Sequence, residues 1–295
     1  MDGTMRDTNH PLASGSEAVL ARLETYYDAV PRFSATTEEH GPFTLFVRTG
    51  QGWHYYARPT LDGPGAFTAE DVERVRARQR EVGAPESFEW VHETTPGLRA
   101  VVEAGGLEIH EHPLLVLDLD GPSAAATGTA AAAADGGPEV RVLAADDPLL
   151  PAAITLPHLA FAESGTQIGT AGPEQLVEAV KSPDTDAAVA RMAGRISAGR
   201  TVLAAVVGPD GAPTASGCHQ PIDGVSEIVA VATLPALRRQ GLARRVTSHL
   251  VEHARTTGVR TLFLSASDDA VARIYESVGF RRIATALIAE PPAEG

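Results

Sequence analysis

The sequence contains very little cysteine, since Cys218 is the single one among 295 residues. One cysteine excludes an internal disulfide framework and a zinc site built from several cysteines. No stretch approaches the roughly 20 consecutive apolar residues of a membrane-spanning helix. The first residues are polar and lack the apolar core of a secretory signal. We therefore expect a cytoplasmic protein without a membrane partner.

Positive charge is also scarce. The chain carries 24 lysines and arginines against 38 acidic residues, a formal net charge of −14. Non-specific binding to nucleic acid depends on neutralising phosphates, so we expect no nucleic-acid partner. An acidic protein can attract a cationic small molecule, although acidity can equally serve solubility alone.

One segment of the chain has the composition of a linker. Residues 121–138 are rich in alanine, glycine, serine and threonine and show no apolar periodicity, as is typical of flexible connections. The sequence therefore predicts an N-terminal α/β domain over residues 1–120 and a second domain over residues 139–290.

Apolar periodicity and turn residues predict alternating helices and strands on both sides of this linker. Before it we expect helices at 16–30, 67–83 (capped by Thr68) and 96–106, and strands at 42–49, 53–59, 88–93, 107–111 and 114–120, the first two joined as a hairpin. After it we expect strands at 139–147, 201–207, 214–220, 227–233, 261–266 and 280–289, and helical segments at 148–163, 172–199, 242–256 and 269–278. This order is a mixed α/β layer with helices on a central sheet.

The two parts of the chain resemble each other locally. A strand and a helix end at Gly106 in the first part and at Gly279 in the second, and a further strand follows each glycine. Glycine at such a position suits a left-handed helix terminus. The similarity predicts a duplicated fold, or else reflects a unit that recurs widely in α/β proteins.

The segment from Glu227 to Arg245 has the pattern of an anion-binding site. An apolar strand ends at Pro235, and a short loop leads to Gly241 and a helix. Glycine lets the backbone approach a ligand closely, and a helix N-terminus presents unpaired N–H groups to a phosphate. Four arginines add positive charge around this loop: Arg238, Arg239, Arg244 and Arg245. The loop alone would be weak evidence, because most glycine loops before helices are simple turns.

Two elements here resemble the GNAT superfamily of N-acetyltransferases. The loop Arg238–Ala243 matches the family's pattern Gln/Arg-x-x-Gly-x-Gly/Ala, and Pro235 stands where the family has a proline. Tyr275 on a short helix, followed by Gly279 and Phe280, matches the second. The resemblance covers about residues 139–290 and implies the GNAT fold, a mostly antiparallel central sheet flanked by helices. It also implies acetyl-coenzyme A as co-substrate and a small-molecule amine as acceptor. The first part would then be a degenerate copy of that fold, shaping the acceptor pocket or a homodimer interface.

The resemblance also implies roles for individual residues. Tyr275 would be the general acid that protonates the leaving thiolate. Asp268 occupies a position where the family commonly has a cofactor-binding asparagine, but a carboxylate cannot donate as an amide does. The remaining cofactor contacts would come from Val231, Ala232, Thr233, Arg238, Arg239, Gln240, Gly241, Leu242, Ala243 and Arg244.

Glu227 is the candidate general base, because it lies 11 residues before Arg238, as the catalytic glutamate does in histone-type members of the family. His158 and Glu163 could instead contact the acceptor. The alternative to an enzyme is an acyl-coenzyme A sensor without turnover, which would need the phosphate loop but neither an acid nor a base.

Overall fold

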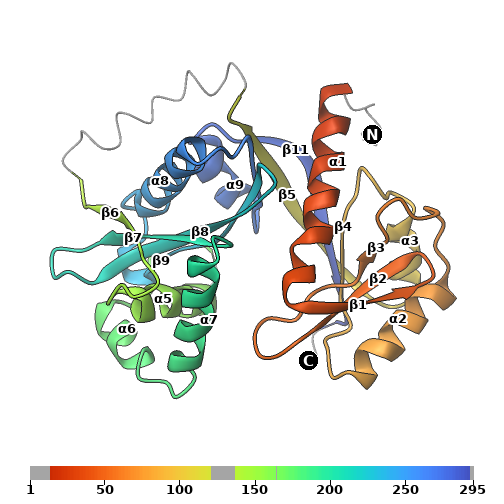
Figure 1. Ribbon diagram of the computed structural model, residues 1–295, viewed down its shortest axis with the longest axis horizontal. Coiled ribbons are helices and arrows are strands. Elements are labelled where there is room, and N and C mark those ends of the chain that lie inside the picture. Colours follow the sequence, from red (N-terminus) through yellow and green to blue (C-terminus); the bar gives the residue numbers. More distant parts are fainter. Residues whose placement is uncertain (1–13, 121–136, 164, 293–295) are drawn as a thin grey trace, which may run out of the picture.

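A computed structural model describes residues 14–120, 137–163 and 165–292 (Figure 1). The expected linker at 121–138 lies outside the described residues except for its last two. We call residues 14–120 the N-terminal half and residues 137–292 the C-terminal half. Among the helices that the structure describes, none has the length and apolarity needed to cross a membrane.

The N-terminal half begins with a long helix, and most of its elements were predicted. Thr68 caps the second helix as expected, through a capping box with Asp71. The elements are α1 (Ser14–Ala29), a 3-10 turn (Pro31–Phe33), β1 (Ala35–His40), β2 (Phe43–Arg48), β3 (Arg58–Pro59), α2 (Ala69–Glu81), β4 (Phe88–Val91), α3 (Leu98–Ala104) and β5 (Glu108–Asp118).

The predicted hairpin between residues 42–49 and 53–59 is wrong, because no tight turn joins these two strands. The tight hairpin joins β1 to β2, with His40 opposite Phe43 and Gly41 at φ +64°, a left-handed conformation that glycine adopts without strain. Strand β3 does pair with β2, but only at Pro59 and the preceding residue. Strand β1 was missed because its polar sequence shows no apolar alternation.

The C-terminal half follows its predicted order closely. The helical segment expected over 172–199 is two helices, because Pro183 lies between them and cannot donate a backbone N–H. The elements are β6 (Val140–Val142), α5 (Leu150–Ala162), α6 (Pro173–Ala179), α7 (Thr185–Ser197), β7 (Val202–Val207), β8 (Pro213–Ile222), β9 (Val225–Thr233), a 3-10 turn (Pro235–Leu237), α8 (Leu242–Thr256), β10 (Thr261–Ser265), α9 (Asp269–Glu276) and β11 (Arg281–Glu290).

Strands of both halves form one eight-stranded sheet, in the order β4-β11-β5-β10-β9-β8-β7-β6. Strands β9 and β10 are parallel and the other neighbours are antiparallel, so the expected mixed, mostly antiparallel sheet flanked by helices is confirmed. Strand β5 lies between β10 and β11, and β11 in turn lies between β4 and β5. Each half therefore completes the sheet of the other, and the division into two domains at the linker stays a prediction.

Helices cover both faces of this sheet. Along β5, Leu115 packs with the cluster that includes Val246 of α8, whereas the next residue, Val116, packs with Leu23 of α1. Successive side chains of a strand point to opposite faces, so α8 and α1 cover opposite faces. Figure 1 shows α1 standing between the C-terminal lobe, with α5 to α7, and the small N-terminal sheet.

Candidate active site

A pocket forms where two parallel strands of the sheet separate. The pairing of β9 with β10 ends at Glu227 and Phe263, and beyond this point a pocket of about 730 Å³ opens. The C-terminal end of β9, the loop before α8, the first turn of α8 and one side of α9 line it. The lining includes nine of the predicted cofactor residues and Tyr275: Val231, Ala232, Thr233, Arg238, Arg239, Gly241, Leu242, Ala243, Arg244 and Tyr275.

A bulge in β9 shapes the pocket wall. The register with β8 shifts between Ser216 and Cys218, and Ala230 has φ +54°. A bulge inserts one residue and reverses the alternation of side chains. Val229 accordingly packs with the cluster of α5, while Val231 packs with that of α8. Past the bulge, the side chain of Thr233 has its hydroxyl oxygen buried without a hydrogen-bond partner among the described residues.

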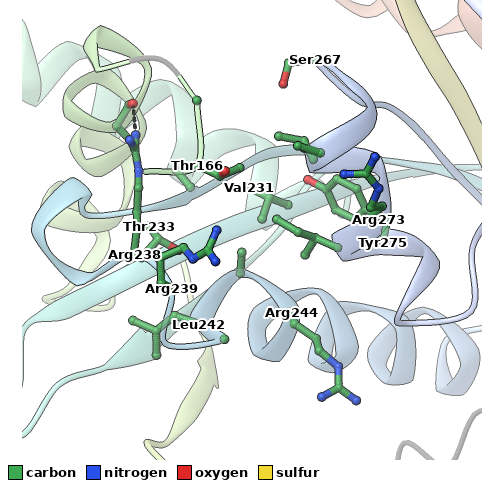
Figure 2. A pocket seen from close by; sticks show the side chains of 18 of the residues that line it. Thr166, Val231, Thr233, Arg238, Arg239, Leu242, Arg244, Ser267, Arg273 and Tyr275 are labelled. Atoms are coloured by element: carbon green, nitrogen blue, oxygen red, sulfur yellow. Dashed lines mark hydrogen bonds between the residues drawn. The ribbon is translucent and has the colours of Figure 1, made fainter. Parts of the chain in front are cut away.

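The loop before α8 presents unpaired backbone donors to the pocket. Arg239 has φ +68°, and Gly241, the N-cap of α8, has φ +75°. The first four N–H groups of a helix have no intrahelical acceptor, and the helix dipole adds positive potential there. Figure 2 shows the guanidinium of Arg239 directed toward the pocket and that of Arg244 directed away from Tyr275. This arrangement suits a phosphate group.

Arg238 lines the pocket and also forms hydrogen bonds within the protein. Its guanidinium donates to the carbonyl oxygens of Ala160 (2.7 Å), Glu163 (2.6 Å) and Gln167 (3.1 Å). The Glu163 carboxylate accepts from the N–H groups of Thr170 (2.9 Å) and Ala171 (2.8 Å), and these hydrogen bonds lower its pKa. The two side chains therefore tie the end of α5 to residues 167–171, and Thr166, next to them, lines the pocket (Figure 2).

Tyr275 lies on the pocket side of α9. It is 8% exposed, and its ring meets Phe280 edge to face, with 6.1 Å between centroids. Burial raises its pKa, so the hydroxyl keeps its proton throughout the neutral and mildly alkaline range. Figure 2 shows that hydroxyl directed toward Val231 of the facing strand. The group can donate a proton to an atom bound in the pocket.

Glu227 does not line this pocket. It stands at the point where the strands separate, and its backbone N–H donates to the Tyr26 hydroxyl of α1 at 3.3 Å. Burial raises the pKa of its carboxyl to about 8, with a further rise from the charge of Glu89 and an opposing effect of Arg58. The structure thus surrounds Glu227 with N-terminal residues that sequence reasoning did not connect to the site.

Two predicted cofactor residues also lie outside the pocket lining. The Asp268 carboxylate accepts from the backbone N–H of Val271 at 2.8 Å and caps α9, so it already has a structural partner. Gln240 is exposed at the tip of the loop. Conversely, Val271 and Ile274 line the pocket beside Tyr275. Their spacing on one face of a predicted helix was the signal that could have found them.

Comparisons with known proteins agree with this geometry. Residues 176–280 match the family model described as the acetyltransferase (GNAT) family. The [ribosomal protein bS18]-alanine N-acetyltransferase of Salmonella typhimurium is 37% identical over 67 residues, which are 22% of this chain and 45% of that relative. The chain thus matches less than half the length of this curated relative.

Solved structures show the same fold over both halves. The GCN5-related N-acetyltransferase from Kribbella flavida has a TM-score of 0.64 at 23% identity, covering 94% of this chain and 96% of that one. A tandem GNAT protein from the clavulanic acid biosynthesis pathway has a TM-score of 0.52 at 15% identity, covering 85% and 79%. The similarity to a tandem GNAT protein favours a duplicated fold over the alternative, a unit that recurs widely in α/β proteins.

Proposed function

We propose that this chain, whose residues 176–280 belong to the acetyltransferase (GNAT) family, transfers an acetyl group from acetyl-coenzyme A to a primary amine. The observation that carries the proposal is one pocket that joins the N-terminus of α8, which suits a phosphate group, to the buried Tyr275. A binding protein needs the first feature but not the second.

The residues present fit coenzyme A. The N-terminus of α8 and the side chain of Arg239 would hold the pyrophosphate. Beyond Glu227, the edge of β9 that faces β10 is unpaired among the described strands, so its backbone groups can bond the amides of the pantetheine arm. The unpartnered Thr233 hydroxyl adds a polar atom in the same wall. When bound, the cofactor supplies an activated acetyl thioester.

The transfer would proceed by direct attack of the neutral amine on the thioester carbonyl. A carbon–nitrogen bond forms, the carbon–sulfur bond breaks, and the amine loses a proton while the sulfur gains one. Glu227 would take the proton from the amine, directly or through water, because it stands where the strands part. Tyr275 would give its proton to the departing thiolate.

The acceptor is proposed as a small amine carrying positive charge. The net charge of −14 favours approach of cations. The Salmonella relative is named for an alanine of a ribosomal protein, so a peptide beginning with alanine belongs in any acceptor panel beside diamines, amino acids and lysine derivatives.

Two measurements test the proposal. Calorimetry should show acetyl-coenzyme A binding to the purified protein, and a thiol-release assay should show turnover with at least one amine of the panel. Binding of acetyl-coenzyme A with thiol release no faster than the enzyme-free rate for every amine would favour the sensor. No binding at all would refute the cofactor site.

A further inference from the structure

We propose that Arg238 and Glu163 are positioning residues for the acceptor amine: together they hold residues 165–171, which we call the rim segment, as the wall of the pocket that the amine contacts. The inference rests on the proposed function, because an acceptor exists only if the pocket transfers an acyl group. Sequence reasoning assigned Arg238 to the cofactor and Glu163 to the acceptor itself, whereas the hydrogen bonds of the two side chains give them one shared role.

The rim segment lies beside the part of the pocket where the reaction would occur. Thr166 of this segment lines the pocket, together with Phe161 at the end of α5. Figure 2 shows the Thr166 side chain beside Val231, toward which the Tyr275 hydroxyl also points. Phe161 is 62% exposed although it lines the pocket. The pocket therefore opens to solvent next to the rim segment, and an amine that enters there meets this segment as it approaches the thioester.

Arg238 holds the rim segment from the loop before α8. Its half-buried guanidinium donates to the carbonyl oxygens of Ala160 at 2.7 Å, Glu163 at 2.6 Å and Gln167 at 3.1 Å. Arginine carries five N–H donors in a planar fork, so one side chain can serve several acceptors at once. Two of these oxygens belong to the end of α5 and the third belongs to the rim segment. The guanidinium therefore fixes the rim segment relative to α5.

Glu163 holds the far end of the rim segment. Its carboxylate accepts hydrogen bonds from the N–H of Thr170 at 2.9 Å, from the N–H of Ala171 at 2.8 Å and from the Thr170 hydroxyl at 3.0 Å. Hydrogen bonds to a charged acceptor are about twice as strong as those between neutral groups. The carboxylate thus closes residues 163–171 into a loop whose two ends are bonded to each other.

The backbone joins the rim segment to the turn that precedes Arg238. The N–H of Gly169 donates to the carbonyl oxygen of Pro235 at 3.0 Å, and the N–H of Ala236 donates to the carbonyl oxygen of Ala171 at 3.0 Å. The approach at Gly169 is close, because a Cβ there would overlap the Glu163 carboxylate and lie 2.8 Å from the Cβ of Pro235. The rim segment and the turn are therefore one hydrogen-bonded unit.

This arrangement has a consequence for the reaction. The acceptor amine must be held with its nitrogen close to the thioester carbonyl, and a displacement of about 1 Å can cost about 100-fold in rate. If Arg238 or Glu163 cannot form its hydrogen bonds, the rim segment is released and the amine loses one wall of its site. The N-terminus of α8 and the open edge of β9 would still hold the cofactor. We therefore expect a loss of affinity for the amine and little loss for acetyl-coenzyme A.

The test disturbs the two side chains separately. Arg238→Lys keeps the positive charge beside the cofactor site but loses the planar fork that reaches three carbonyl oxygens. Gly169→Ala leaves Arg238 unchanged and displaces the Glu163 carboxylate by steric overlap. Gly172→Ala is the matched control in the same stretch of chain, because its Cβ would make an ordinary contact of 3.5 Å with that of Ala236.

Three quantities are measured for each variant. Calorimetry gives the Kd of acetyl-coenzyme A, and thiol release at saturating acetyl-coenzyme A gives the KM of the amine. Calorimetry on protein saturated with coenzyme A gives the Kd of the amine, which requires no turnover. The amine is the one with the fastest thiol release in the panel, or butane-1,4-diamine if none reacts. Arg238→Lys and Gly169→Ala should weaken amine binding about 10-fold or more and change the Kd of acetyl-coenzyme A less than about 2-fold, whereas Gly172→Ala should match the wild type.

Unchanged amine affinity in either folded variant would overturn the inference, and so would an equal loss of affinity for the amine and for acetyl-coenzyme A. If Arg238→Lys does not fold, Gly169→Ala decides the result. Weaker amine binding in the variants of a protein that releases no thiol would support the positioning role and refute the proposed reaction. Wild-type turnover with unchanged amine affinity in the variants would refute the positioning role alone. A wild-type protein that binds no amine in either assay would refute both.

Discussion

Replacing Tyr275 by phenylalanine removes one hydroxyl from the pocket and little else. The ring stays packed on Phe280, and the residue lines the pocket. The free energy of unfolding should therefore change by no more than about 0.5 kcal/mol. Because burial raises the pKa of Tyr275, the wild-type group is protonated at every pH used in an ordinary assay.

The expected loss is in turnover. A positioned general acid contributes roughly 10²–10⁴-fold. A thiol resembling cysteine has a pKa of about 8.5 and is a fairly good leaving group, so we expect the low end, about 100-fold in kcat or about 2.7 kcal/mol in the activation barrier. The affinity for acetyl-coenzyme A should barely change, since the hydroxyl acts on charge that develops only as the bond breaks.

The assay measures kcat by thiol release and cofactor affinity by calorimetry on the same preparations. Tyr55→Phe is the matched control: it removes a hydroxyl that bonds Ser34 at 2.7 Å in the N-terminal half, and it should keep wild-type kcat. Wild-type turnover in Tyr275→Phe would refute the acid role. Lost affinity with normal kcat would make Tyr275 a cofactor contact instead.

Three further predictions follow from other parts of the structure. Gly241→Glu should abolish coenzyme A binding in calorimetry, with the fold retained in circular dichroism. The control Gly258→Glu, at the far end of α8 and at a comparable φ of +84° against +75° for Gly241, should bind coenzyme A normally. Equal affinities of the two variants would mean that the loop before α8 is a simple turn. Burial and then His253 lower the pKa of His219 to about 4, so its neutral form stabilises the fold above pH 6.5 and this contribution is lost as pH falls toward 4. Between pH 8 and pH 5, the free energy of unfolding measured in urea should fall by about 2 kcal/mol more in the wild type than in His219→Gln. An equal fall in both proteins would contradict this. Cationic amines should be acetylated faster than neutral ones, and added salt should reduce this difference in rate by screening. Faster acetylation of neutral or anionic amines would show that the net charge does not determine the acceptor.

Local signals predicted most of the elements but not how the halves join. The strands at 261–266 and 280–289 were expected from their apolar residues, and both exist. That β5 lies between them could not be predicted, because strand pairing across more than 100 residues leaves no periodic trace. Residues 107–111 and 114–120, predicted as two strands, form the single strand β5, whose pairing with β11 continues through Pro113.

The site was predictable where one short segment carries it. Gly241 and the residues around it line the pocket because strand, loop and helix are consecutive. The environment of Glu227 was not predictable, since Tyr26, Arg58 and Glu89 come from three distant elements. Asp268 was assigned to the cofactor by its position, yet an aspartate directly before a helix is also a favoured N-cap, and capping is what the structure shows.

We expect the pocket between β9 and α9 to transfer an acetyl group rather than merely to bind its carrier. The most direct measurement incubates the protein with acetyl-coenzyme A labelled in the acetyl group and with the amine panel, then follows free thiol and labelled product by mass spectrometry. We expect a labelled N-acetyl amine formed in equal amount to free thiol, at a rate that falls about 100-fold in Tyr275→Phe. Saturable binding of acetyl-coenzyme A with no labelled amine from any acceptor would contradict it.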